Sequence, residues 1–330
     1  MDSFCSKVFS FMQKKQPVQK KAPTIKRDPN LYVILPYFNY CEYGRRKQLF
    51  LEFIERIRNL APIRIIVVEA ALSGTKFQLP KAIPGVYKHI GFVTEHRLWI
   101  KENLINLAVK QIPDSWYYMA WIDADITFLN KNWISDTIKT LEHKDIVQMF
   151  HTAMHMGPDD EALKIERGFG YMHQTSNQPY HKDAKYGFWH PGFCWAITRP
   201  AFDKMGGLID WAIMGSGDRH TALALIGKVE YSHPGNISKD YAQKLQELQA
   251  RCQGLTLGFV KGTIIHHWHG RIEDRKYQER WNILTKGEYK PSSDVVHNKN
   301  GVLQLSQEGE RLHPEFCAYF AGRKEDCTTL

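Results

Sequence analysis

The sequence predicts an α/β protein with a mixed, mostly parallel sheet flanked by helices and folded as a single domain. Short apolar segments rich in β-branched residues alternate with segments whose apolar residues recur at helical spacing. Several of the apolar segments end in polar or charged residues, as strands do where a parallel sheet binds ligands. A chain of 330 residues is long enough to bury a sizeable core.

The first half of the chain carries the clearest alternation. Residues 31–36 form an apolar strand, and residues 42–60 place apolar side chains on one helical face. Strands are predicted at 63–68 and, more weakly, at 89–93. Residues 99–112 are expected to be helical until Pro113 ends the helix. An apolar strand then runs from Tyr117 toward Asp123 and Asp125.

The second half is less regular. A polar stretch without periodicity at residues 155–187 suggests a functional loop that closes over a ligand. The remaining predicted strands are 145–150, 193–198 and 261–265, and the remaining predicted helices are roughly 221–226 and 272–284.

Charge and composition divide the chain into three parts. Residues 1–28 are expected to form a basic disordered tail, residues 29–285 a folded domain, and residues 286–330 a C-terminal extension. The net charge is +9, but residues 1–30 alone hold seven Lys or Arg and two Asp, so the excess does not indicate nucleic-acid binding by the folded part. The tail could make weak contact with an anionic membrane surface. Neither a signal peptide nor a membrane-spanning stretch is recognised, and the six cysteines are scattered, which indicates reduced thiols and a cytoplasmic location.

The Asp-x-Asp sequence at Asp123 and Asp125 is the most informative motif. In an extended strand this spacing puts both carboxylates on one face, where they repel each other unless a cation lies between them. Oxygen ligands suit Mg²⁺ or Mn²⁺, which are often shared with substrate phosphates. The alternative is a turn at a strand end with solvated carboxylates.

Two further clusters carry candidate chemistry. His266 and His269 lie in a His-His-Trp-His run at a strand end, and with Asp123 and Asp125 they would form a mixed oxygen and nitrogen site that fits Mn²⁺. These rings could instead be hydrogen-bonded core histidines. Asp218 follows a Gly-Ser-Gly sequence before a helix, where it could be a helix N-cap or a general base.

In this order, the motifs resemble those of the GT-A nucleotide-sugar glycosyltransferases, which have a Rossmann-like catalytic domain. The likeness covers about residues 31–284 and is to the β-1,4-galactosyltransferase, polypeptide N-acetylgalactosaminyltransferase and family-2-like enzymes of bacteria, phages and large DNA viruses. It rests on Pro36-Tyr37, Lys101 with Leu104-Ile105-Asn106, Asp123-Ala124-Asp125, the strand and Gly-Gly turn of 193–207, Ser216-Gly217-Asp218, and His266 with His269. The chain departs from that family at Gly217, where a glutamate is usual. It also departs at Phe38 and Tyr40, which follow the first proline in place of arginines, and it lacks the familiar transmembrane anchor.

The resemblance implies a metal-dependent, inverting transfer of a sugar from a UDP-sugar to a hydroxyl of a glycan or glycoprotein. Mn²⁺, or Mg²⁺, would be bound by Asp125 and His269 with His266, and Asp123 would contact the ribose or a metal-bound water. Asp218 would be the general base. The other nucleotide-binding residues would be Pro36, Tyr37, Glu69, Lys101 and Asn106.

Further expectations concern the acceptor, the location and the alternatives. Trp195 and Trp211 could stack on sugar rings or belong to the core. The location would be the cytoplasm, that of a host cell for a viral protein. One alternative is a sugar nucleotidyltransferase, although Pro36-Tyr37-Phe38-Asn39 is not the Gly-rich basic loop that such enzymes need. The other is a carbohydrate-binding protein of the same fold without catalysis.

Overall fold

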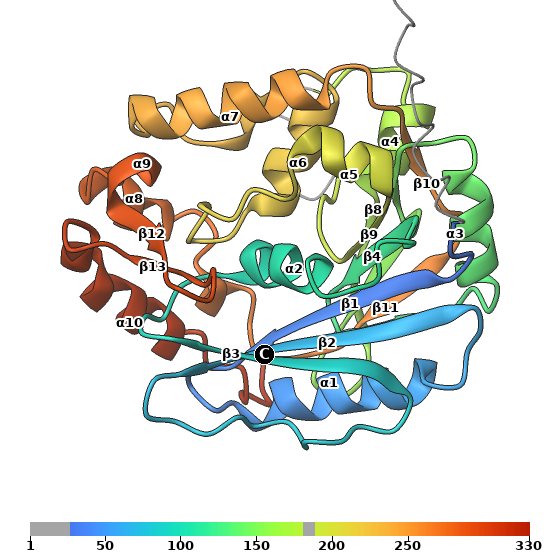
Figure 1. The fold of residues 1–330 in the computed structure, drawn as a ribbon, viewed down its shortest axis with the longest axis horizontal. Coiled ribbons are helices and arrows are strands. Elements are labelled where there is room, and N and C mark those ends of the chain that lie inside the picture. Colours follow the sequence, from blue (N-terminus) through green and yellow to red (C-terminus); the bar gives the residue numbers. More distant parts are fainter. Residues whose placement is uncertain (1–26, 181–188) are drawn as a thin grey trace, which may run out of the picture.

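The computed structural model describes residues 27–180 and 189–330, and its centre is a seven-stranded sheet (Figure 1). Across this sheet the strand order is β10-β6-β9-β4-β1-β2-β3. The strands are β1 (Leu31–Phe38), β2 (Ile63–Leu72), β3 (Val86–Thr94), β4 (Tyr118–Ile122), β6 (Ile146–Gln148), β9 (Cys194–Thr198) and β10 (Leu257–Phe259).

The sheet is mixed and mostly parallel, as the sequence predicts. β1 runs parallel to both β2 and β4, and the pairs β2–β3 and β10–β6 are also parallel. Only β9 runs against its neighbours, β4 and β6. The carboxyl ends of β1 and β4 therefore lie side by side near the middle of the sheet.

Both faces of the sheet are buried, which explains why its strands are continuous apolar runs. Alternate residues of β1 face opposite cores: Tyr32 and Ile34 belong to one, and Leu31, Val33 and Leu35 to the other. The first core is covered by α2 (Lys101–Val109), α5 (Arg199–Met205), α6 (Gly217–Leu225) and α7 (Lys239–Cys252). The second is covered by α1 (Gly44–Ile57) and α3 (Trp133–Leu141) (Figure 1).

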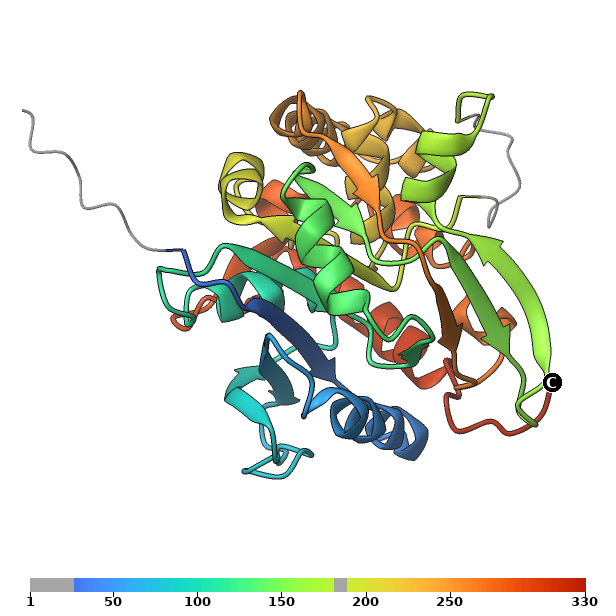
Figure 2. The same cartoon turned by 90° about the vertical axis from the view of Figure 1, so that its right-hand side faces the viewer.

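A second sheet of four strands lies beside the first and holds part of the segment that the sequence presents as an irregular loop. Its order is β5 (Ile126–Phe128), β11 (Thr263–His266), β7 (Thr152–Met156) and β8 (Ala162–Arg167). Figure 2 shows the β7–β8 hairpin at the right-hand edge of the molecule. The expectation of an unstructured stretch at 155–187 is therefore wrong for β8 and for α4 (Phe169–Thr175). β8 is mostly exposed, so its sequence lacks an apolar run. Residues 181–187 of that stretch lie outside the described residues.

The end of the chain packs against the domain. It contains α8 (Trp281–Lys286), α9 (Pro291–Asp294), the hairpin β12 (Val295–His297) and β13 (Leu303–Leu305), and α10 (His313–Ala321). Short 3-10 turns lie at Val229–Ser232, Glu273–Arg275 and Gly309–Leu312. The single helix expected at 272–284 is thus a short turn followed by α8. On α10, Phe316 and Phe320 are buried in the first core.

Two further details concern the expected segments. Asp28, assigned to the tail, accepts a hydrogen bond from the hydroxyl of Tyr32 at 2.7 Å, and the tail up to residue 26 lies outside the described residues.

α7 was not predicted from the sequence, although Tyr241, Leu245 and Leu248 form its buried stripe and the Ser238 side chain caps it by accepting from Tyr241 N. In the described part of the chain, no helix combines the length and the apolar character needed to cross a bilayer.

Candidate functional site

A cavity of about 280 Å³ opens beyond the carboxyl ends of β1 and β4. The end of β1, the start of α2, the turn after β4, the start of α6 and the segment after β11 all contribute to its wall. Eight of the ten predicted site residues line it: Pro36, Tyr37, Lys101, Asp123, Asp125, Asp218, His266 and His269.

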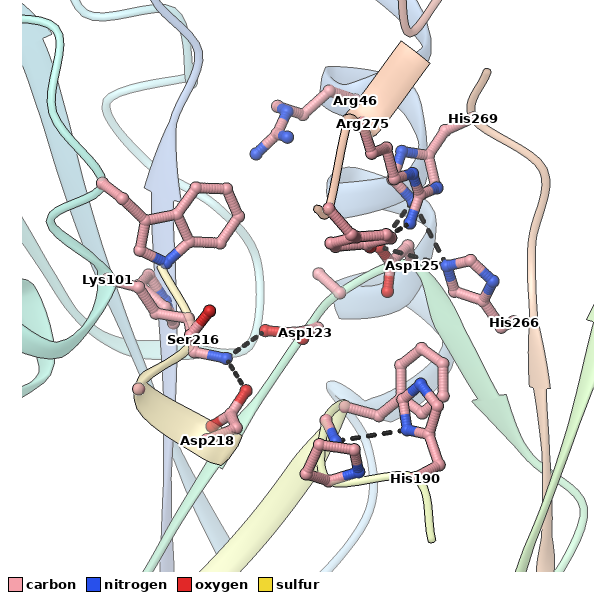
Figure 3. A pocket seen from close by; sticks show the side chains of 18 of the residues that line it. Arg46, Lys101, Asp123, Asp125, His190, Ser216, Asp218, His266, His269 and Arg275 are labelled. Carbon is pink, nitrogen blue, oxygen red and sulfur yellow. Dashed lines mark hydrogen bonds and ion pairs between the residues drawn. The ribbon is translucent and has the colours of Figure 1, made fainter. Parts of the chain in front are cut away.

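Asp125 and the two histidines converge at one side of this cavity (Figure 3). The Nε2 atom of His269 lies 2.9 Å from Asp125 Oδ2, and that of His266 lies 3.7 Å from the same oxygen. The two Nε2 atoms are 3.3 Å apart. Strand pairing explains the convergence, because β5 and β11 are antiparallel neighbours and His267 N donates to Asp125 O at 2.8 Å.

The chemistry of this trio fits a divalent cation such as Mn²⁺. The Oδ1 atom of Asp125 is buried without a hydrogen-bond partner among the described residues. Burial would raise the pKa of Asp125, but His266 and His269 outweigh it and hold that pKa well below its usual range. Burial lowers the pKa of His266 to about 3, so its ring is neutral and able to bind a metal. The Arg275 guanidinium lies 2.9 Å from His269 Nε2 and would compete with a cation for that nitrogen.

Asp123, the other half of the Asp-x-Asp motif, faces away from this trio toward Lys101. Lys101 Nζ donates to Asp123 Oδ1 at 3.0 Å and to Asp218 Oδ2 at 2.7 Å (Figure 3). Burial alone would lower the pKa of Lys101, but the two carboxylates raise it well above its usual value. Burial in turn raises the pKa of Asp123 to about 6, with Lys101 opposing. The structure thus brings Lys101, Asp123 and Asp218 together as one charge cluster.

Asp218 is not the N-cap of α6. That position belongs to Ser216, and Asp218 lies in the first turn of the helix. Besides the ammonium of Lys101, Asp218 accepts a hydrogen bond from Trp121 Nε1 at 3.3 Å. A negative charge in the first turn is favourable because the helix dipole is positive there.

Two predicted nucleotide-binding residues do not line the cavity. Glu69 accepts from Gln78 N at 2.6 Å and from Leu79 N at 3.1 Å, which fixes the loop after β2. Asn106 holds Leu208 through both its side-chain oxygen and nitrogen. Each makes structural hydrogen bonds in the described structure.

The predicted tryptophans also lie away from the cavity wall. Trp195 is in the core, 1% exposed, with its Nε1 donating to Pro191 O. Trp211 packs edge-on against Tyr241. Trp99, two residues before the first residue of α2, does line the cavity.

Sequence reasoning missed one carboxylate and two arginines that lie next to the trio of Asp125, His266 and His269. Glu325 Oε2 lies 3.7 Å from His269 Nδ1 and is 1% exposed. Arg46 and Arg323 each approach Glu325 Oε1 within 2.6 Å. Burial would raise the pKa of Glu325, but the two guanidinium groups hold it well below its usual range. Glu325 and Arg323 lie in a segment without periodicity, so the sequence carries no signal for them.

Other polar and charged residues of the cavity were also missed. Arg275, Tyr277 and Arg280 follow the histidine run within a few positions, so their proximity to it was the available signal. Glu102, the neighbour of Lys101, lines the cavity while only 4% exposed, and burial raises its pKa to about 8 against the influence of Lys101.

A second histidine cluster lies on the wall near His266. His155 Nε2 lies 2.7 Å from Glu166 Oε2, and His190 Nε2 lies 3.7 Å from it. The ring centroids of His155 and His266 are 5.0 Å apart. However, Gly192 N donates to His190 Nδ1, which places the ring proton of a neutral His190 on Nε2, facing Glu166. The cluster is therefore already satisfied by hydrogen bonds.

Comparisons with known proteins give only distant matches. No protein-family model and no curated protein matches the sequence. Among solved structures, the catalytic domain of Drosophila beta1,4-galactosyltransferase 7 in complex with xylobiose is 14% identical, with 87% of this chain and 98% of that chain covered and a TM-score of 0.41. The mannosyltransferase PcManGT from Pyrobaculum calidifontis, in complex with GDP-Man and Mn²⁺, is 13% identical, with 91% and 73% covered and a TM-score of 0.43.

A third match is Staphylococcus aureus TarS residues 1–349 in complex with UDP-GlcNAc. It is 8% identical, with 73% of this chain and 59% of that chain covered and a TM-score of 0.43. Matches at these identities and TM-scores assign no activity to the chain, so its function has to be inferred from the cavity itself.

Proposed function

We propose that the protein is a metal-dependent glycosyltransferase that moves a sugar from a UDP-sugar to a hydroxyl of a glycan or glycoprotein, with inversion at the anomeric carbon. The observation that carries this proposal is the convergence of Asp125, His266 and His269 in a cavity that also contains the Asp218 carboxylate. A cation-binding trio and a separate carboxylate at one cavity are the groups needed to hold a diphosphate and to accept a proton.

The donor would bind with its diphosphate near the trio. Arg46, Arg275, Arg280 and Arg323 line the cavity and provide cationic donors suited to phosphate oxygens. Pro36 and Tyr37, at the end of β1, would border the nucleoside. Mn²⁺ or Mg²⁺ bound by Asp125, His266 and His269 would neutralise negative charge on the leaving diphosphate.

The transfer step would use Asp218 as the general base. The acceptor oxygen attacks the anomeric carbon, the bond from that carbon to the diphosphate oxygen breaks, and UDP leaves with the bonding electron pair. Asp218 accepts the proton of the hydroxyl. Lys101, which ion-pairs with Asp218, keeps this carboxylate in place until the acceptor arrives. A single displacement of this kind converts an α-linked donor into a β-linked product.

The test is a panel of nucleotide sugars incubated with the full chain in Mn²⁺ and in EDTA. We expect one or a few UDP-sugars to raise the melting temperature with Mn²⁺ and to release UDP, and EDTA to abolish both effects. Release or consumption of pyrophosphate would instead identify a nucleotidyltransferase. A metal-dependent thermal shift without any product would identify a binding protein.

A further inference from the structure

Glu102 is a buried carboxyl group that the mechanism above does not use. It follows Lys101 at the start of α2, it is 4% exposed, and it lines the cavity. Among the described residues, its carboxyl group has a hydrogen bond with its own backbone N–H and with no other residue. A carboxyl group has sites for more hydrogen bonds than this one, so a hydroxyl of a ligand in the cavity is a reasonable further partner.

The carboxyl group of Glu102 lies against Gly217 at the start of α6. A Cβ atom added at Gly217 would lie 2.2 Å from Glu102 Oε1 and 2.6 Å from its Cδ. The backbone does not require glycine, because Gly217 is not among the residues with positive φ. The carboxyl group of Glu102 thus fills the space that a side chain at residue 217 would take, immediately before Asp218.

We propose that Glu102 is an acceptor-binding residue, which holds the hydroxyl next to the one that Asp218 deprotonates. This inference rests on the proposed glycosyltransferase function and names the acceptor as a molecule with neighbouring hydroxyl groups, such as a sugar ring. The contact of the Glu102 carboxyl with the start of α6 carries it, since that contact sets Glu102 beside Asp218 on the same wall.

The protonation of Glu102 suits this role. Burial raises its pKa to about 8, Lys101 opposes the rise, and Asp218 and Asp123 add to it. Near neutral pH the carboxyl group is therefore largely protonated, and it can both donate and accept a hydrogen bond. The carboxylate of Asp218, which ion-pairs with Lys101, can only accept. An acid beside a carboxylate matches two neighbouring hydroxyl groups, one of which gives up its proton.

The first test compares E102Q, E102L and E95Q, the last as a control because Glu95 is exposed. The probe acceptors are a panel of p-nitrophenyl α- and β-glycosides, offered with the UDP-sugar that the wild type hydrolyses. E102Q keeps a donor and an acceptor, so its kcat/KM for the glycoside should stay within about threefold of wild type. E102L should lose about 10- to 100-fold in kcat/KM for the glycoside. Its affinity for the UDP-sugar should change little, because the proposed diphosphate contacts lie at the trio and the arginines.

A second test exchanges the two positions. G217E alone places two carboxyl groups in one space and should lose transfer. The double variant E102A/G217E returns a single carboxyl group to that space and should recover transfer relative to E102A. Melting temperatures verify that each variant is folded.

The outcomes separate this inference from the proposed function. If no nucleotide sugar yields UDP, the proposed function fails. If the donor is hydrolysed but E102L transfers to glycosides as fast as wild type, or E102Q and E102L lose transfer equally, the role of Glu102 is overturned. The role is also overturned if no glycoside accepts the sugar or slows donor hydrolysis in the wild type.

Discussion

Glu325 Oε2 lies 3.7 Å from the Nδ1 atom of His269, on the side of the ring opposite the nitrogen that faces Asp125. A carboxylate on Nδ1 favours the tautomer in which Nδ1 carries the proton and Nε2 is free to bind a metal. Arg46 and Arg323 hold Glu325 from two sides. The last segment of the chain therefore completes the surroundings of the candidate metal ligands.

We predict that E325Q weakens Mn²⁺ binding about 10- to 100-fold, the range typical of changes in the groups that orient metal ligands. The amide keeps the shape of the side chain but removes the charge that orients His269. The measurement is a Mn²⁺ titration followed by calorimetry, with the melting temperature of the metal-free protein recorded separately. The exposed Glu315 provides the matched control, E315Q. An unchanged affinity for Mn²⁺ would show that Glu325 serves only the fold.

The trio of Asp125, His266 and His269 was open to prediction because each residue lies at or just beyond the end of an apolar strand. Apolar runs are visible in a sequence, and polar residues at their ends converge wherever the strands are neighbours. What the sequence did not reveal was the second, four-stranded sheet, in which β5 pairs with β11. That pairing directs Asp125 to the histidines and leaves Asp123 to Lys101.

Other parts of the site depend on contacts between distant segments. Asn106 and Glu69 have the residue types of ligand-binding groups, but each is used to fix a loop. In the sequence Glu102 is an ordinary helix residue, and only the fold places its side chain against Gly217. Sequence periodicity reports which face of an element is buried, but not which element covers it.

A second prediction concerns the ligand Asp125 itself. D125A should abolish the stabilisation by Mn²⁺ with a UDP-sugar and reduce UDP release to background, because the two imidazole rings alone hold a divalent cation weakly. D159A, at an exposed aspartate, is the control. Thermal shift with and without Mn²⁺ gives the readout. Full turnover of D125A, or of the wild type in EDTA, would contradict a metal-dependent mechanism.

A third prediction concerns Asp218. D218N keeps the shape of the side chain but cannot accept the acceptor proton, so transfer should fall on the order of 10²- to 10⁴-fold. Binding of the UDP-sugar should survive, because the proposed diphosphate contacts lie at the trio and the arginines. Steady-state rates and donor titrations measure the two effects. The anomeric coupling constant of the product, read by NMR, decides the stereochemistry: an α-linked product from an α-linked donor would rule out single displacement with Asp218 as base.

The last prediction uses the pKa of Glu102 to set the pH dependence of stability. In the unfolded chain this glutamate titrates with its ordinary pKa of 4.5, whereas burial raises the pKa of folded Glu102 to about 8. Between these values the folded state binds more protons than the unfolded state, so the free energy of unfolding falls as pH rises from about 4.5 to about 8. Lys101 opposes this effect, whereas Asp218 and Asp123 add to it.

E102Q has no proton to lose and should escape this decline. Its melting temperature relative to wild type should therefore increase between pH 5 and pH 9, while that of E95Q should stay parallel to wild type. Scanning fluorimetry across this range measures both differences. Because wild type and E102Q share every other titrating group, the change in their difference reports Glu102 together with its coupling to Lys101, Asp218 and Asp123. If the difference in melting temperature between E102Q and wild type stays constant with pH, Glu102 is ionised at neutral pH. It would then bind the acceptor as a second carboxylate and not as a protonated acid.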